Sequence, residues 1–456
     1  MSSSSSILSD ISCSSSGCSS SSSDEGPISR GDKSYSPLVA EPSEAFLPRR
    51  RAAKVDRSLD GDFTRTDWES HVMAKLRESS WHEYYHMPVE VFYSLHKLLF
   101  SEADIRRCKL KGDSGSPMGS IDTRVKLACC LRELFGEKRK SLVDVFKISP
   151  SSARLAFIDC LARINACKAL ECRIFDTDHS HEALAERSRN FSQRSSFPTI
   201  LRDVVGAIDG LFIKTNQPKV AEVGNVRSFY SGHKRGFGIN MQGVVDASCR
   251  FIGFACNTPG STSDYTAFRH SNFYGTWAQV PSPYYYVGDC AYPLGPSCLI
   301  PFVGSNLPVA EDVFNFYHSQ LRITVERAFG IYVNVFGIFH SQLAFNISTS
   351  CMVVEACVRL HNFRIDNCCQ HVARRPGNGP IFRQAFDRSN DAYDVLDDER
   401  YRTCRPHPTD AAYAAHVATT ELNSGITDAA IGQLRRSAIV QALATAGAER
   451  PAKNKR

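Results

Sequence analysis

The sequence predicts an α/β protein in which a mixed sheet flanked by helices follows a mainly helical region. Apolar residues recur at helical spacing from about 62 to 195, and short apolar runs of strand character begin near 200. Helical patterns return near 308–340 and 348–363, so strands come first and a strand flanked by helices comes later. The chain has 456 residues, 42% of them hydrophobic, which is enough for two or three domains with a large core.

Residues 1–61 are expected to be a disordered, serine-rich tail. The stretch MSSSSSILSDISCSSSGCSSSSSDEG has low complexity and too little apolar surface to form a core. A basic cluster, LPRRRAAKVDR at 47–57, is typical either of a nuclear localisation signal or of a solvated tail. We therefore expect a nuclear protein, with the cytoplasm as the alternative compartment.

The helical region, residues 62–195, contains a segment that resembles a helix-turn-helix. A short helix over Leu142–Phe146 meets a break at Ile148–Pro150, and Ser151 or Ser152 can cap a second helix. This arrangement is typical of DNA-reading helix pairs. An ordinary helical hairpin within a bundle has the same pattern, so both interpretations stay open.

Four strands are predicted within the next domain, residues 200–366. Their sequences are VVGAIDGLFIKT, GFGINMQGVVDA, RFIGFACNTPG and YYYVGD. Beyond residue 372, the stretch RRPGNGP indicates a linker. The rest of the segment 372–456 is a polar tail with one helix predicted near 427–446.

Four acidic residues lie within or next to apolar segments, where a buried charge is unfavourable. Asp209 interrupts the strand GAIDGLFI, Asp289 closes YYYVGD, Asp264 follows a Pro-Gly turn, and Glu326 lies at the centre of the apolar run RITVERAFG. Structural roles are the alternative: a helix cap for Asp264, a turn for Asp289, and an ion pair with Arg322 for Glu326. The mid-strand Asp209 is the hardest to explain structurally, because it loses hydration there.

These acids predict a metal site if the fold brings them together. Neighbouring strands place Asp209 and Asp289 near each other, and a helix packed on the sheet brings Glu326 to the same point. Clustered carboxylates repel each other unless divalent cations lie between them, and Mg²⁺ or Mn²⁺ prefers such oxygen ligands. Two ions about 4 Å apart activate the attacking oxygen and stabilise the leaving oxygen in phosphodiester chemistry.

Basic residues follow the first predicted strand and indicate DNA binding. The net charge of +6 permits this partner without requiring it. Cations interleaved with aromatic residues suit a DNA backbone, although a solvated hairpin loop has the same composition. Arg322, beside Glu326, pairs with either a phosphate or a carboxylate. The other candidates are Lys214, Arg227, His233, Lys234 and Arg235.

The 17 cysteines indicate reduced thiols in an intracellular protein, since their number is odd and no signal-peptide pattern is present. A zinc site is disfavoured, because the spacing of the nearest candidates fits no common zinc motif. No apolar run reaches the roughly 20 residues that cross a bilayer, so no membrane association is expected. The zinc candidates are Cys357, His361, Cys368, Cys369 and His371.

Five motifs in a fixed order carry a resemblance to a known family. They are AIDGLFIK, YSGHKRGFGINMQGVVD, PGSTSDYTAF, GDCAYPL and FNFYHSQLRITVERAFG. In this order they resemble PIF/Harbinger-type transposases and the nucleases derived from them, a DDE superfamily endonuclease group with an RNase H-like core. The resemblance implies that Asp209, Asp289 and Glu326 are catalytic metal ligands and that Asp264 is an additional acid near the metal.

The same resemblance implies hydrolysis of phosphodiester bonds at transposon ends, with joining of the 3′ ends to target DNA in a full transposase. It also implies a separate Myb-like DNA-binding partner, and a homo-oligomer is a further expectation. Two motifs depart from the family pattern, in the basic segment after Tyr230 and at Cys290–Tyr292. The alternative function is a domesticated, non-catalytic DNA-binding or adaptor protein, although all four acids are present.

Overall fold

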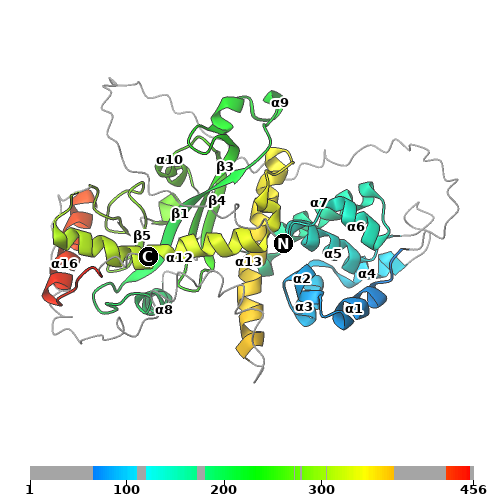
Figure 1. The fold of residues 1–456 in the computed structure, drawn as a ribbon, viewed down its shortest axis with the longest axis horizontal. Helices are drawn as coiled ribbons and strands as arrows, with labels where there is room; N and C mark the ends of the chain where they lie inside the picture. The colour runs from blue at the N-terminus through cyan, green and yellow to red at the C-terminus, as the bar shows by residue number, and fades with distance from the viewer. Residues whose placement is uncertain are drawn as a thin grey trace, which may run out of the picture.

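The computed structural model describes residues 65–109, 120–171, 180–271, 273–277, 280–304, 306–373 and 428–451. Over these residues the protein has a mixed sheet flanked by helices and preceded by a helical region, which confirms the predicted fold class (Figure 1). The serine-rich tail and most of the linker lie outside the described residues, and so do the predictions made for them.

The sheet is built around β1 (Val204–Lys214). On one side β1 pairs antiparallel with β3 (Gly236–Val245), which pairs antiparallel with β4 (Phe251–Pro259). On the other side β1 pairs in parallel with β5 (Tyr285–Val287), and β5 pairs in parallel with β6 (Cys298–Leu299). The four predicted strands are therefore confirmed as β1, β3, β4 and β5, whereas β6 is too short to show a sequence pattern.

One face of the sheet is covered by α12 (Val309–Val335), a helix of 27 residues that crosses the strands (Figure 1). Its apolar side chains, such as Leu321 and Phe329, share one buried cluster with Ala207 and Met241 of the sheet. Because side chains alternate along a strand, every second residue of β1 and β3 faces this helix. The centre of α12 therefore has a fixed position over β1.

The other face of the sheet packs on α8 (His181–Ser192) and α10 (Asp264–Arg269). A second buried apolar cluster lies on this face. Ile208 and Val244 of the sheet and Phe268 of α10 belong to it. Burial on both faces explains why the strands appear as nearly continuous apolar runs in the sequence.

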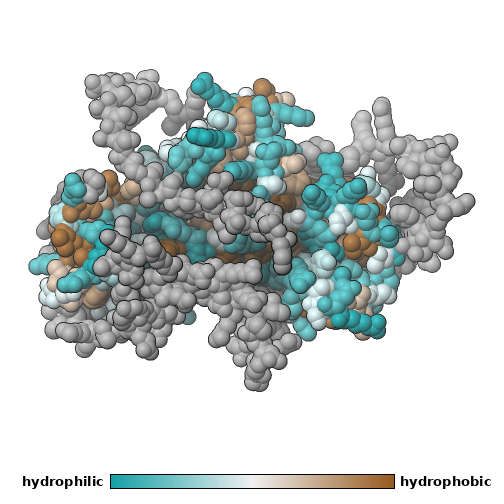
Figure 2. Space-filling view, viewed as in Figure 1, coloured by the Kyte–Doolittle hydropathy of each residue, from teal (hydrophilic) through white to brown (hydrophobic). Residues whose placement is uncertain are grey.

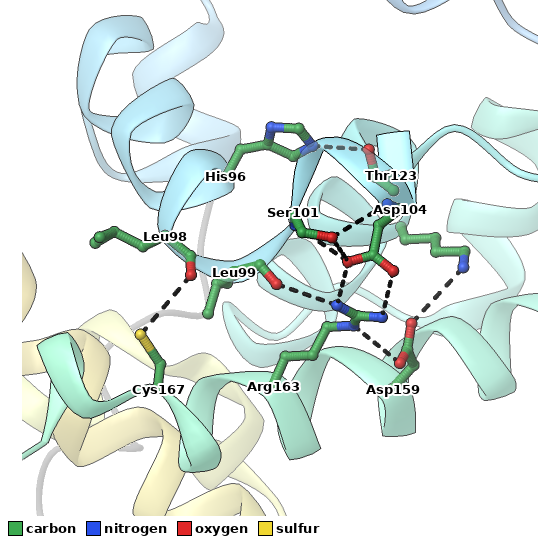
Figure 3. Close-up of polar contacts among 10 residues, drawn as sticks. His96, Leu98, Leu99, Ser101, Asp104, Thr123, Asp159, Arg163 and Cys167 are labelled. Carbon is green, nitrogen blue, oxygen red and sulfur yellow. Dashed lines mark hydrogen bonds and ion pairs between the residues drawn. The ribbon is translucent and has the colours of Figure 1, made fainter. Parts of the chain in front are cut away.

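The helical region has an aromatic core between its first helices. Trp68 stacks on Phe92 at 5.1 Å between ring centroids, and Trp81 packs edge-on against the same phenylalanine. The Arg163 guanidinium, on the seventh helix of this region, donates hydrogen bonds to the Asp104 carboxylate and to the Leu99 carbonyl (Figure 3). It thereby ties that helix to the third and fourth helices. The helices are α1 (Trp68–Arg77), α2 (Trp81–Tyr85), α3 (Val89–Leu99), α4 (Glu102–Lys109), α5 (Thr123–Leu134), α6 (Arg139–Phe146) and α7 (Pro150–Ala166).

The helix pair α6–α7 matches the segment that resembles a helix-turn-helix. The predicted cap at Ser151 or Ser152 is wrong, because the Ser149 hydroxyl accepts the Ser152 amide at 3.1 Å and Pro150 takes the first helical position. α7 packs against α5 and leaves Leu155 58% exposed. This packing is compatible with both a DNA-reading pair and a bundle hairpin.

A long helix, α13 (Ile347–Ala373), joins the helical region to the sheet. It packs on β4 and on α7. The Asn165 amide donates to the Met352 carbonyl at 3.0 Å, and the Arg364 guanidinium donates to the His86 carbonyl at 3.0 Å. These contacts fix the two regions against each other.

The predicted C-terminal helix is confirmed as α16 (Asp428–Thr445), and it docks beside β6 and α12. The Arg436 guanidinium lies 3.7 Å from the centre of the Phe302 ring and donates to the Pro301 carbonyl at 3.2 Å. Arg435 donates to the carbonyl of Pro296, two residues before β6. Figure 2 shows hydrophobic residues gathered at this end of the molecule. Leu434 of α16 is itself 38% exposed. Among the described helices, none is long and apolar enough to span a bilayer.

Candidate active site

Asp209 lies in the middle of β1 and is only 7% exposed. Its Oδ1 accepts the backbone amide of Gly210 at 2.8 Å. Burial raises the pKa of Asp209 to about 7, and repulsion from Asp289 and Glu326 acts in the same direction. The Gly210 amide and Arg322 oppose this rise without cancelling it. The carboxyl group therefore sits in a site that is poor in compensating positive charge.

Asp289 follows the end of β5. Because β1 and β5 are parallel and Ala207 pairs with Val287, two further residues along each chain bring Asp209 and Asp289 to the same level of the sheet, just past the end of β5. Asp289 Oδ1 accepts the amide of Ala291 at 2.9 Å, so the residue does form the turn considered as its structural role. Burial raises the pKa of Asp289, and the charges of its acidic neighbours add to that rise.

Glu326 projects from the centre of α12 and pairs with Arg322, one turn earlier. Arg322 Nη1 lies 2.5 Å from Glu326 Oε1 and 3.7 Å from Asp209 Oδ2. The ion pair expected as the structural alternative is therefore present. It also extends to β1, so the guanidinium bridges the helix and the central strand.

Asp264 opens α10 and is not its cap, because Ser263 occupies the N-cap position. The capping role considered for Asp264 is therefore wrong. Its Oδ1 instead accepts the side-chain amides of Asn240 and Gln242, each at 3.0 Å. An added Cβ at Gly210 would lie 2.2 Å from this oxygen, so the glycine leaves the space that the carboxylate fills.

Asp209 and Asp264 approach β1 from opposite faces of the sheet. Gly243, the register partner of Asp209, faces Phe329 of α12, whereas Gly210 faces Asp264 on the α10 side. Asp289 is electrostatically coupled to both, because its charge raises the pKa of Asp209 and the charge of Asp264 raises the pKa of Asp289. The four acids thus form one electrostatic cluster around the end of β5.

Two amides of β3 and one tyrosine were missed by the sequence predictions. The Tyr292 hydroxyl donates to Gln242 Oε1 at 2.6 Å, and Gln242 Nε2 bonds both Asn240 Oδ1 and Asp264. The alternating Asn and Gln in GINMQGVV were a usable signal, since polar side chains on one face of an otherwise apolar strand need partners. These residues hold the Asp264 carboxylate in place.

The donor chemistry of the cluster fits a hard divalent cation. All four acids offer carboxylate oxygens, and burial together with mutual repulsion raises the pKa values of Asp209 and Asp289. In the described residues, the side chains as they stand form no group of three His, Cys, Asp or Glu close enough to hold a metal ion. Part of the reason is visible in α12, where Glu326 bonds Arg322 instead.

The basic candidates separate into two places. Arg322 lies at the acids, whereas Lys214 ends β1, five residues and about 17 Å beyond Asp209. Arg227 lies in the 3-10 helix just before β2 (Tyr230–Ser231), and the other three lie in the turn between β2 and β3; all four are exposed. Within the described residues none of these hairpin side chains forms an ion pair. They are Arg227, His233, Lys234 and Arg235.

Of the five candidate zinc ligands, the structure describes the side chains of Cys357 and His361, and both are fully buried on α13. His361 Nε2 lies 2.9 Å from the Cys249 carbonyl, and burial lowers the pKa of this histidine to about 4. The other three candidate side chains lie outside the described residues. The cysteines that the structure describes are free thiols.

Comparisons with known proteins cover the part of the chain that contains these acids. Residues 208–362, which include all four acids, match the sequence model of the family described as "DDE superfamily endonuclease". The chain is also similar to "Protein ALP1-like" of Arabidopsis thaliana, with 27% identity over 198 residues, 40% of this chain and 47% of that protein. The match thus spans about half the length of this curated relative, and no solved structure matches significantly. The resemblance seen in the motifs is thus confirmed for residues 208–362, which are similar to the DDE superfamily endonuclease family over about a third of the chain.

Proposed function

We propose that the protein is a metal-dependent DNA endonuclease of Harbinger type that hydrolyses phosphodiester bonds at transposon ends. Joining of the freed 3′ ends to target DNA is the second step of the proposal. The observation that supports it most is that Asp209 and Asp289 follow paired residues of neighbouring parallel strands, while Arg322 contacts both Asp209 and Glu326. The three acids come from a strand, a loop and a helix that are far apart in the sequence, and their charges act on one another.

In this proposal Asp209, Asp289 and Glu326, assisted by Asp264, hold one or two Mg²⁺ or Mn²⁺ ions. Bound metal would supply charge neutralisation at the scissile phosphate and activation of the attacking oxygen. The chain's own contribution is positioning. The Gly210 amide orients Asp209, and the Ala291 amide orients Asp289. Arg322 pairs with Glu326 and lies near Asp209, and from this position its guanidinium can pair with a DNA phosphate in place of a carboxylate.

The hairpin cations extend the proposed site along the DNA. A separation of about 17 Å between Asp209 and Lys214 equals about five base pairs of B-form DNA. Exposed cations at that distance suit backbone contacts that set the register of the duplex. A Myb-like partner for end recognition, a homo-oligomeric assembly and a nuclear location complete the proposal.

The test is cleavage of end-labelled duplex DNA by the full chain with Mg²⁺ or Mn²⁺. Wild type is expected to cut, whereas Asp209→Asn and Glu326→Gln are expected to lose at least about 100-fold in rate, since each removes a metal-binding charge. Asp312→Asn is the matched control, because Asp312 is a carboxylate at the other end of α12 that pairs with Arg450. Equal cutting by all four proteins would refute the site assignment.

A second candidate, a non-catalytic DNA-binding protein, is favoured by one observation. Glu326 is engaged by Arg322 at 2.5 Å, which is the arrangement of a structural ion pair. Calorimetric titration with Mn²⁺ separates the two functions. A catalytic site binds the ion and loses binding in Asp209→Asn, whereas an adaptor shows no such difference.

A further inference from the structure

An aromatic and cationic surface lies beside the acid cluster on α10 and the short helix that follows it, α11 (Tyr274–Trp277). Tyr265 is 43% exposed and Tyr274 is 40% exposed, so both rings are accessible to a ligand. The Arg269 guanidinium lies between them, 5.9 Å from the Tyr265 ring centre and 5.8 Å from the Tyr274 ring centre. The surface therefore offers two aromatic rings and one guanidinium group within about 6 Å of each ring centre to a ligand from solvent.

This surface is connected to the acids by rigid contacts. Tyr265 directly follows Asp264, whose carboxylate is held by two amides. On the other side, Tyr274 packs edge-on against the buried Phe268 at 5.2 Å, and Phe268 packs against Tyr292 at 5.6 Å. The positions of the exposed rings are therefore set by the same side chains that organise the acid cluster.

We propose that Tyr265, Arg269 and Tyr274 form a stacking platform for an unpaired DNA base next to Asp264, on the α10 side of the proposed cleavage site. Exposed aromatic faces with an arginine are the recurrent means of holding single-stranded nucleic acid, since every base has a planar face and every nucleotide a negative charge. The inference deepens the proposed function, on which it rests for its substrate class. It assigns the site a DNA with locally unpaired strands, such as a frayed or already nicked end.

The experiment compares two probes that differ only in strand pairing. They are a blunt duplex and the same duplex carrying an unpaired overhang with 2-aminopurine at its first position. The full chain carrying both Asp209→Asn and Glu326→Gln is titrated into each, which keeps the probes intact. Fluorescence anisotropy gives the affinity, and 2-aminopurine quenching reports stacking.

The platform is expected to favour the overhang by at least about 5-fold, the lower end of the stacking contribution of one base. Tyr265→Ala and Tyr274→Ala are expected to remove the preference and the quenching, and Tyr265→Phe to keep both. Arg269→Gln is expected to weaken binding and lower the salt slope by about one. Met73→Ala, at an exposed position of the helical region, is the control and changes neither reading.

Two results overturn the platform: no preference in the chain with intact tyrosines, or an unchanged preference in both alanine variants. If those variants keep the preference but lose self-association, the surface belongs to contacts between protein copies. Separate cleavage assays distinguish the two proposals. Cleavage without an overhang preference removes the platform alone, and an overhang preference without cleavage by wild type removes the nuclease alone.

Discussion

Arg322 and Glu326 lie one helical turn apart on α12 and form an ion pair of 2.5 Å, which points the guanidinium at Asp209 on β1. The pair therefore does more than stabilise a helix. It supplies positive charge at the place where three carboxylates from different elements meet. The balance between this one arginine and the surrounding acids governs how the site responds to substitution and to pH.

Replacing Arg322 is expected to raise the pKa of Asp209 further, because the guanidinium is one of the groups that lower it. Arg322→Gln should shift the acidic limb of the cleavage pH profile to higher pH and reduce cleavage by at least about 10-fold, roughly the contribution of one charged hydrogen bond. Arg322→Lys should keep part of the rate. Arg250→Gln breaks a surface ion pair with Asp366 and serves as the control. An unmoved pH profile in Arg322→Gln would separate the arginine from the acids.

Asp209 is expected to make stability depend on pH. Its pKa is about 7 in the folded chain against an ordinary value of 3.8, so the folded chain binds a proton that the unfolded chain has lost. Without divalent metal, the free energy of unfolding should fall as pH rises from about 4 to about 7, by up to about 4 kcal/mol, and then level off.

Asp209→Asn should remove this fall, since an amide does not titrate. Urea denaturation at several pH values is the measurement, and the variant should exceed wild type in stability only on the alkaline side. Asp312→Asn, at a half-exposed position, should follow wild type throughout. A parallel pH dependence for wild type and Asp209→Asn contradicts the assignment of the buried proton.

Two glycines allow a matched test of Asp264. Gly210→Ala places a methyl group 2.2 Å from Asp264 Oδ1 and should displace that carboxylate, lowering cleavage by at least about 10-fold at saturating metal. Gly330→Ala on α12 meets nothing within 4 Å and should raise stability by about 0.5–1 kcal/mol with unchanged cleavage. Full activity in Gly210→Ala would show that the position of Asp264 is not needed.

The hairpin cations are expected to bind DNA phosphates. Combined alanine replacement of Arg227, Lys234 and Arg235 should lower duplex affinity and reduce the slope of log affinity against log salt by about three. Lys97→Ala on α3, also at an exposed position, is the control and should leave the slope unchanged. An unaltered slope in the triple variant would mean that the hairpin is only a solvated loop.

The acids could be picked out of the sequence because each is a charged residue within or at the end of an otherwise apolar segment, such as Asp209 within an apolar strand. Strand order then follows from pairing, and it brought Asp289 beside Asp209 as expected. Side-chain engagement was harder to predict. The choice between Arg322 and a metal for Glu326 depends on rotamers, and the amide bonds to Asp264 depend on the register of β3 opposite Gly210.

The docking of α16 was not predictable either, because its pattern shows a helix but not a partner. Its attachment depends on Arg436 stacking over Phe302 and on Gly432 passing close to Gly295, where an added Cβ would come within 2.7 Å of the backbone nitrogen. Such contacts form between segments that are well over a hundred residues apart. Periodicity within one helix carries no information about them.

The position of α16 has a consequence for synthesis on the ribosome. Every sheet strand among the described residues has been translated once β6 is complete, yet the helix that packs beside this last strand is encoded more than a hundred residues later. Until that helix has left the ribosome, the surface beside β6 stays uncovered in the nascent domain. Exposed strand edges and apolar surface of this kind are what molecular chaperones bind.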